Sequence, residues 1–162
     1  MFNLPTRNLA AETKFQQLLS LGMPSGDYAI FGSAPLWVYN ITQELHDLDV
    51  IARGAAWEIA KTKGVLQPTK SNHGRELILF EGNIEISNKW ITGEWNINEL
   101  IDTSEIVQGV RLVNLEYIIR EKLINHRERD KEDLKKIEEF ISLNRLPIPL
   151  PSTVRPLWEE KI

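Results

Sequence analysis

The sequence predicts a single α/β domain of the α+β kind, in which a small mixed sheet is covered by helices on one face. We expect a helical C-terminal half and a proline-rich tail to follow. Three observations lead to this prediction. Short apolar segments alternate with segments of helical periodicity up to residue 112. Two longer amphipathic patterns come next, and prolines then interrupt the chain from residue 144 onward.

The first elements are a helix, a strand and a second helix. Apolar residues at helical spacing predict a helix over 10–21. The apolar run 27–31 predicts a strand. Ser33 is suited to cap a helix over 34–42, and Pro35 is acceptable in its first turn, where backbone N–H groups have no partner inside the helix.

The middle of the chain is predicted to hold short strands and two helices. The strands are expected at 46–52, 65–67, 76–80 and 83–87, with two more short strands inside 106–112, around Gln108 and Gly109. Helices are expected over 55–63 and 97–101. Glu81 and Gly82 predict a tight hairpin turn between two of the strands.

Two helices and an extended tail are expected in the C-terminal part. Asn114 is a suitable cap for a helix over 115–125, and a last helix is expected over 131–143. We therefore assign 1–143 to one domain and 144–162 to an extended tail. The tail is too apolar for a simple linker, so we expect it to pack on the domain or on a neighbouring subunit. Its apolar residues are Leu146, Ile148, Leu150, Leu157 and Trp158.

Composition limits the class of protein and its partners. The chain has 162 residues, no cysteine and no apolar run long enough to cross a membrane, and its start does not have the pattern of a signal peptide. We therefore expect a cytoplasmic protein with no membrane partner and no disulfide or thiolate metal site. The net charge of −4 argues against strong binding to duplex nucleic acid.

The segment around Asp47 and Asp49 carries the most chemical information. Successive side chains on a strand point to opposite faces, so these two carboxylates are expected to share one face while Leu48 and Val50 share the other. Two neighbouring carboxylates repel each other unless a cation lies between them. The pattern therefore predicts a site for Mg²⁺ or Mn²⁺ and, through the cation, for phosphate.

A strand, a Gly32-Ser33 turn, a helix and then Asp-x-Asp on a second strand resemble the nucleotidyltransferase superfamily typified by DNA polymerase beta. The resemblance implies that Asp47 and Asp49 hold metal ions and that Gly32 and Ser33 bind the phosphates of a nucleoside triphosphate (NTP). It also implies a third acid on a neighbouring strand, which here can only be Glu85. The superfamily usually has Asp at this position.

A second, more local match lies in the C-terminal half. The segments 114–122 and 127–134 resemble the helix pair of small bacterial and archaeal nucleotidyltransferases related to abortive-infection toxins. That family has Leu-x-x-x-(Ile/Val)-x-x-x-Lys, a short gap and then Arg-x-Lys-Asp-x-x-Asp-(Ile/Leu). By this resemblance Lys122 approaches the phosphates, and Arg127 and Arg129 steer the triphosphate. Two further acids, Asp130 and Asp133, would cap and brace the last helix.

The resemblance implies transfer of a nucleoside monophosphate (NMP) from an NTP to an acceptor hydroxyl. The acceptor stays open among a small molecule, a protein and an RNA. A chain of this length has little room for an acceptor domain, so we expect a homodimer or a partner from the same operon to complete the site. The main alternative is a module on the same fold that binds a nucleotide or a partner without turnover. An Asp-x-Asp glycosyltransferase is a third option, but its fold normally needs a longer chain.

Each of these residues also has a purely structural interpretation. Asp47 and Asp49 could be solvent-facing strand residues, and Glu85 a surface residue of an edge strand. Gly32-Ser33 could be an ordinary turn and cap. We expect His46 to be a polar edge residue, with orientation of a carboxylate or contact with nucleotide as the alternative. Trp37, Trp57, Trp90 and Trp95 are expected to pack in or around the core rather than stack on bases. Of these, Trp90 and Trp95 are the candidates for contact with the nucleotide or the acceptor.

Overall fold

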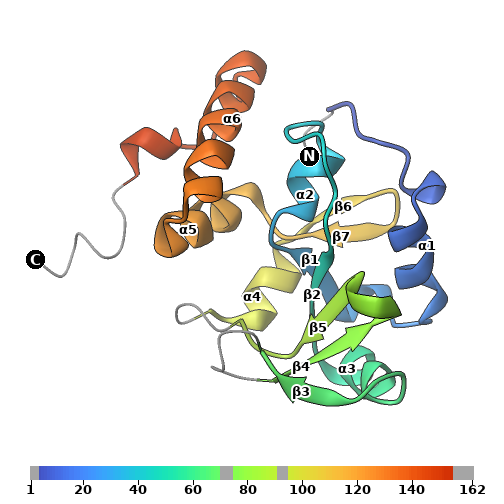
Figure 1. Cartoon of the computed structure of the whole chain (residues 1–162). Coiled ribbons are helices and arrows are strands. Elements are labelled where there is room, and N and C mark those ends of the chain that lie inside the picture. The colour runs from blue at the N-terminus through green and yellow to red at the C-terminus, as the bar shows by residue number, and fades with distance from the viewer. Residues whose placement is uncertain (1–3, 70–74, 91–94, 155–162) are drawn as a thin grey trace, which may run out of the picture.

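The computed structural model describes residues 4–69, 75–90 and 95–154, which form a seven-stranded mixed sheet flanked by helices (Figure 1). The strands are β1 (Tyr28–Phe31), β2 (Leu48–Ala52), β3 (Leu66–Pro68), β4 (Arg75–Leu79), β5 (Ile84–Ser87), β6 (Glu105–Val107) and β7 (Val110–Leu112). The α-helices are α1 (Thr13–Ser20), α2 (Ala34–Val38), α3 (Gly54–Lys61), α4 (Ile97–Asp102), α5 (Leu115–Asn125) and α6 (Glu128–Asn144). The predicted mixed α/β class is confirmed.

The sheet has the order β3-β4-β5-β2-β1-β7-β6. Strand β2 lies in the middle, antiparallel to β1 and parallel to β5. In this register Asp49 is opposite Phe31 on one side and Glu85 on the other. Directly opposed residues point to the same face of a sheet, so these three side chains share one face.

Both faces of this sheet are covered at its central strands. All residues of β1 are buried, which requires cover on each side. On the face of the sheet that is opposite to Asp49, Gly64, which follows α3 in the chain, lies against the side chain of Leu79. On the acidic face, which carries Asp49 and Glu85, the ring of Trp95 packs on Phe31 and also contacts Tyr117 of α5. Strand β1 is therefore covered on both sides, as its unbroken apolar run indicates.

Two helix boundaries differ from the predictions for local reasons. Helix α2 ends at Val38 rather than at residue 42, because Asn40 adopts a left-handed backbone conformation (φ 62°) that stops the helix. Helix α6 begins at Glu128 rather than at 131. There, Asp130 accepts a hydrogen bond from the backbone N–H of Arg127 at 3.0 Å and fixes the first turn.

The predicted hairpin between β4 and β5 is present, but its turn is longer than expected. The last paired residues are Leu79 and Ile84, so four residues connect the strands instead of two. Phe80 and Glu81 both have positive φ, as does Gly82. The second hairpin is confirmed, with Gln108 and Gly109 between β6 and β7.

The tail packs on the last helix as far as the structure describes it. Ile148 and Pro151 are buried, and the backbone N–H of Ser152 donates to Glu138 of α6 at 3.1 Å. Residues 145–154 of the tail thus pack against α6. Leu157 and Trp158 lie outside the described residues.

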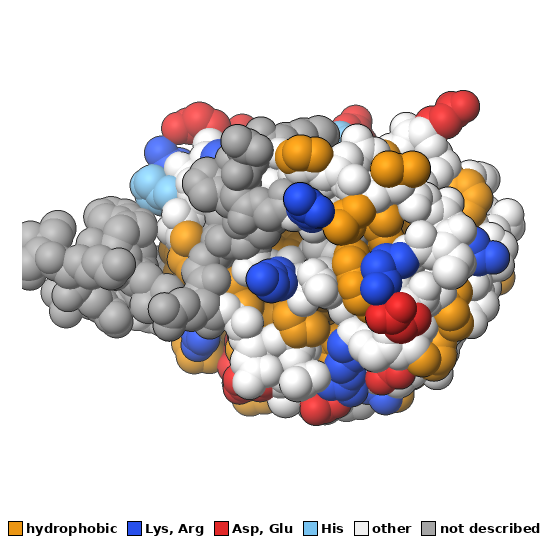
Figure 2. Space-filling view, turned by 90° about the horizontal axis from the view of Figure 1, so that it is seen from below, with side chains coloured by type: hydrophobic (Ala, Val, Ile, Leu, Met, Phe, Trp, Pro, Cys, Tyr) orange, Lys and Arg blue, Asp and Glu red, His pale blue; other side chains and the backbone are white. Residues whose placement is uncertain are grey.

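No helix among the described residues is both long enough and apolar enough to span a bilayer. The large exposed hydrophobic side chains belong to separate elements, for example Leu19, Val65, Ile106 and Leu143. On the face shown in Figure 2, hydrophobic and basic side chains are mixed, and some acidic side chains lie among them.

Candidate functional site

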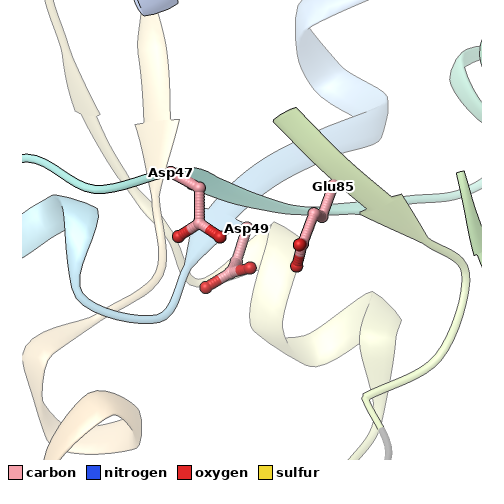
Figure 3. A group of neighbouring side chains, drawn as sticks. All are labelled: Asp47, Asp49 and Glu85. Carbon is pink, nitrogen blue, oxygen red and sulfur yellow. The ribbon is translucent and has the colours of Figure 1, made fainter. Parts of the chain in front are cut away.

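Three carboxylates meet at one end of the central strands. Asp47 directly precedes β2, Asp49 is its second residue, and Glu85 lies on β5. One oxygen atom from each carboxylate lies within 4.8 Å of those from the other two. Figure 3 shows the three side chains pointing to the same side of the two strands. The predicted convergence of Asp47, Asp49 and Glu85 is confirmed.

The strand geometry explains this convergence. The period-2 alternation expected for β2 places Leu48 and Val50 in the core, at 0 % and 1 % exposed, and their acidic neighbours on the opposite face. The parallel register between β2 and β5 then places Glu85 directly beside Asp49. Glu85 lies on an interior strand, between β4 and β2, so the interpretation as an edge-strand residue is wrong.

The acids line a cleft of about 640 Å³. Both the Gly32-Ser33 turn and the end of the α5–α6 helix pair contribute to its walls. All eight site residues predicted from the sequence line this cleft: Gly32, Ser33, Asp47, Asp49, Glu85, Lys122, Arg127 and Arg129. The interpretation of the two aspartates as residues of an open sheet surface is therefore wrong.

Asp49 is the electrostatic centre of the cluster. Burial, followed by the negative charges of Asp47, Glu85 and Glu121, raises the pKa of Asp49 well above its usual range. The charged form of this carboxyl is thus strongly disfavoured in the protein alone. Either a proton or a cation must compensate the charge that accumulates there.

A divalent cation fits this donor set. Hard cations such as Mg²⁺ and Mn²⁺ prefer carboxylate oxygens, and both are often held by only a few carboxylates together with phosphate oxygens. Asp47, Asp49 and Glu85 provide three such groups close together, in a position where positive charge would relieve their repulsion. These three residues would therefore hold the cation.

Gly32 is required by its contact with Asp49. Its backbone is left-handed, with φ at 69°, and a Cβ added there would collide with the Asp49 carboxylate and lie 3.2 Å from the Asp49 Cβ. A side chain at this position would thus be strained and would also displace the central acid. The position of the Asp49 carboxylate therefore depends on glycine in the turn.

Ser33 does not act as the helix cap that the sequence suggested. It occupies the cap position of α2, but its side chain makes no capping hydrogen bond. Instead its Oγ accepts a hydrogen bond of 3.0 Å from the Nζ of Lys122. Helix α2 has five residues, so its dipole contributes little at this end. The interpretation as an ordinary turn and cap is therefore wrong for the hydroxyl.

The basic residues of the cleft differ in their availability. Lys122 is buried and makes ion pairs with Asp130 and Asp133. Arg127 donates through Nε to Asp130 at 2.7 Å. In contrast, Arg129 is exposed and makes no ion pair within the described part of the chain. The resemblance placed Asp130 and Asp133 as cap and brace of the last helix, and their contacts agree with this.

Further residues of the cleft were not identified from the sequence. Glu121 and Asn125 line it from α5, and Asn125 donates to the Glu121 carboxylate at 2.8 Å. Burial is the main cause that raises the pKa of Glu121. Lys89, exposed after β5, also lines the cleft. The i,i+4 spacing of Glu121 and Asn125 on the helix that carries Lys122 was the signal available for the first two.

The aromatic residues pack as expected. Trp90 stacks on Phe31 with ring centroids 4.5 Å apart, and Trp95 meets the same ring edge-on at 5.5 Å. Trp90 also forms part of the cleft wall. His46 lies at the rim with 75 % of its side chain exposed, as expected for a polar edge residue.

Comparison of the chain with protein-family models, with curated proteins and with solved structures found no match.

Proposed function

We propose that this protein is a metal-dependent nucleotidyltransferase with the minimal fold of the DNA polymerase beta superfamily, which moves an NMP from an NTP to an acceptor hydroxyl. The observation that carries the proposal is the meeting of three carboxylates with a glycine-dependent turn and basic side chains in one cleft. Phosphoryl transfer requires acids that hold a metal ion, a turn that the phosphates can approach closely, and basic side chains that can meet the phosphates.

The residues divide the work as follows. Asp47 and Asp49 hold Mg²⁺, and Glu85 acts as third ligand or as base for the acceptor. Mg²⁺ at this position would neutralise phosphate charge and make the acceptor hydroxyl more acidic. The acceptor hydroxyl loses its proton, to Glu85 where this residue acts as the base, and its oxygen forms a bond to the α-phosphorus. The bond between that phosphorus and the bridging oxygen breaks, so pyrophosphate leaves. Arg129, exposed in the same cleft, is suited to meet the triphosphate.

A label-transfer assay tests this function. NTP labelled at the α-phosphate is incubated with Mg²⁺, the protein and candidate acceptors, namely the protein itself, RNA and small hydroxyl compounds. We expect label to move to one acceptor from α-labelled NTP and not from γ-labelled NTP. Transfer must be lost in the Asp47→Asn, Asp49→Asn double variant. Transfer that survives in this variant would contradict the proposed site.

One observation favours the second candidate, a binding module without turnover. The Lys122 ammonium is already bonded to the Ser33 hydroxyl and paired with two carboxylates, so the cation that the resemblance placed at the phosphates is not free to stabilise charge in the transition state. Thermal denaturation with Mg²⁺ and a non-hydrolysable NTP separates the two candidates. Ligand at a hundred times its dissociation constant stabilises a protein by about 2.7 kcal/mol. Stabilisation that depends on Asp47 and Asp49, without label transfer, would identify the module.

A further inference from the structure

The ammonium group of Lys122 is completely enclosed by three acceptors. The side chain is only 2 % exposed. Its Nζ lies 3.0 Å from Ser33 Oγ, 3.0 Å from Asp133 Oδ2 and 3.5 Å from Asp130 Oδ1. An ammonium has three N–H donors, so these contacts account for its full donor capacity. A buried charge needs such partners because its removal from water is costly.

The three acceptors come from two separate parts of the fold. Asp130 and Asp133 lie on the first turns of α6, whereas Ser33 belongs to the turn after β1. Asp130 is itself fixed by Arg127, through the backbone N–H and the guanidinium. Lys122 therefore connects the helix pair to the Gly32-Ser33 turn, two segments separated by 89 residues in the chain.

This connection determines what the Ser33 hydroxyl can do. A hydroxyl has one donor and two acceptor lone pairs. Because the oxygen accepts a hydrogen bond from Lys122, its own proton remains available for an acceptor in the cleft, which Ser33 lines. A hydroxyl that accepts from a cation is also a stronger donor.

We propose that Lys122 is a positioning residue, which holds the Ser33 hydroxyl and its turn toward the phosphates and does not itself contact the phosphates. The inference rests on the proposed function for the identity of the ligand. It differs from the resemblance, by which Lys122 would approach the phosphates directly. Both residues line the cleft, but Arg129 is exposed there whereas Lys122 is buried, so Arg129 contacts the triphosphate itself.

A double-mutant cycle separates the two roles. The dissociation constant of a non-hydrolysable NTP with Mg²⁺ is measured for the wild type, for Lys122→Met, for Ser33→Ala and for the double variant. If Lys122 acts through Ser33, each single change raises the dissociation constant about tenfold. The dissociation constant of the double variant is then no higher than that of the single variant that binds less tightly. If the two losses multiply, Lys122 contacts the ligand independently and the inference is wrong.

Matched controls make the cycle specific. Lys131→Met removes an exposed lysine of α6 that pairs with Glu128 at 3.0 Å, and it should leave affinity unchanged. Arg129→Met combined with Ser33→Ala should give losses that multiply, as expected for two direct contacts. Lys122→Met leaves Asp133 without its cationic partner, whereas Asp130 keeps its ion pair with Arg127. Lys122→Met with Asp133→Asn therefore serves as a charge-matched variant if the single variant does not fold.

Hydrogen exchange tests the positioning role without any nucleotide. Exchange of the backbone N–H groups of Gly32, Ser33, Ala34 and Leu36 is compared between the wild type, the charge-matched variant and Lys131→Met. We expect faster exchange in the charge-matched variant alone, and unchanged exchange there would overturn the inference. If the wild type binds no NTP, the proposed function fails, and this experiment still decides whether Lys122 holds the turn.

Discussion

At the scale of single residues, the contact between Gly32 and Asp49 organises the site. The left-handed glycine allows the central carboxylate to lie directly against the turn, where a Cβ would collide with it. The carboxylate in turn accumulates negative charge from Asp47, Glu85 and Glu121. The accumulated charge opposes folding in the protein alone, so we expect it to serve a positively charged ligand near Asp49. The glycine adopts its left-handed conformation without strain, and its lack of a side chain is what lets the carboxylate lie so close.

Replacing Gly32 tests the close contact. We expect Gly32→Ala to lower the free energy of unfolding by more than Gly22→Ala, which serves as the control. Both glycines have φ at 69°, so both changes incur the cost of about 1 to 2 kcal/mol for a left-handed residue with a side chain. Gly22 has open space around it, whereas Gly32 faces the Asp49 carboxylate. If urea denaturation shows the same loss of unfolding free energy for both variants, the contact between Gly32 and Asp49 is unimportant for stability.

Replacing Asp49 tests the charge. The raised pKa means that ionisation of Asp49 opposes folding; this penalty is absent below its ordinary pKa of 3.8 and grows as the pH rises. We therefore expect Asp49→Asn to stabilise the protein at pH 7 by on the order of 1 kcal/mol, and by less at pH 4. Glu116→Gln on exposed α5 surface is the control. A clear loss of melting temperature at pH 7 would identify a structural aspartate instead.

At the scale of elements, the α5–α6 pair is attached to the sheet by polar and aromatic contacts. Lys122 joins it to the turn after β1, and Tyr117 reaches the acidic face through Trp95. The first turn of α6 is fixed by the capping box of Arg127 and Asp130. These contacts place Arg127 and Arg129 at the cleft, so the helix pair is part of the site rather than an appendage.

Asp130 gives this attachment a pH dependence. Burial alone would raise its pKa, but hydrogen bonds from Arg127 and the charges of Lys122 and Arg127 outweigh burial and lower it. Its stabilising contribution is therefore complete above the ordinary value of 3.8 and is lost as the pH falls through the lowered pKa. We expect the unfolding free energy of the wild type to fall more steeply below pH 4 than that of Asp130→Asn.

Asp130→Asn is also expected to lower the free energy of unfolding at neutral pH. Removing one partner of a buried ion pair typically destabilises a protein by about 3 to 5 kcal/mol. Asp130→Asn should show a loss of this order at pH 7, whereas Glu132→Gln at an exposed position of the same helix should not. Parallel pH profiles for the wild type and Asp130→Asn would contradict the account of the attachment.

At the scale of the whole molecule, local patterns predicted much of the fold and long-range packing decided the rest. The strand around Asp49 and the short hairpin at Gln108-Gly109 follow from residue types alone. The cover on both sheet faces and the four-residue turn after Leu79 depend on tertiary contacts that no local pattern records. The donor network of Lys122 is of the same kind, because its acceptors lie 8, 11 and 89 residues away in the chain.

In the candidate site, too, local patterns predicted some features and long-range packing determined the others. Alternation predicted that Asp47 and Asp49 share a face, and the resemblance supplied Glu85 and the basic residues of the helix pair. Neither indicated that Glu121 is buried beside the acids or that the Ser33 hydroxyl is bonded to a lysine. Side chains that are brought together by packing between distant elements can be found only once the elements are placed.

The most direct test of the account is the position of a bound cation. In crystals grown with Mn²⁺ and a non-hydrolysable NTP, we expect an anomalous-scattering peak bounded by oxygens of Asp47, Asp49 and Glu85, with the triphosphate running toward Gly32 and Ser33. Manganese bound elsewhere, or a triphosphate that avoids this turn, would contradict the claim that the cleft is a metal-dependent nucleotide site.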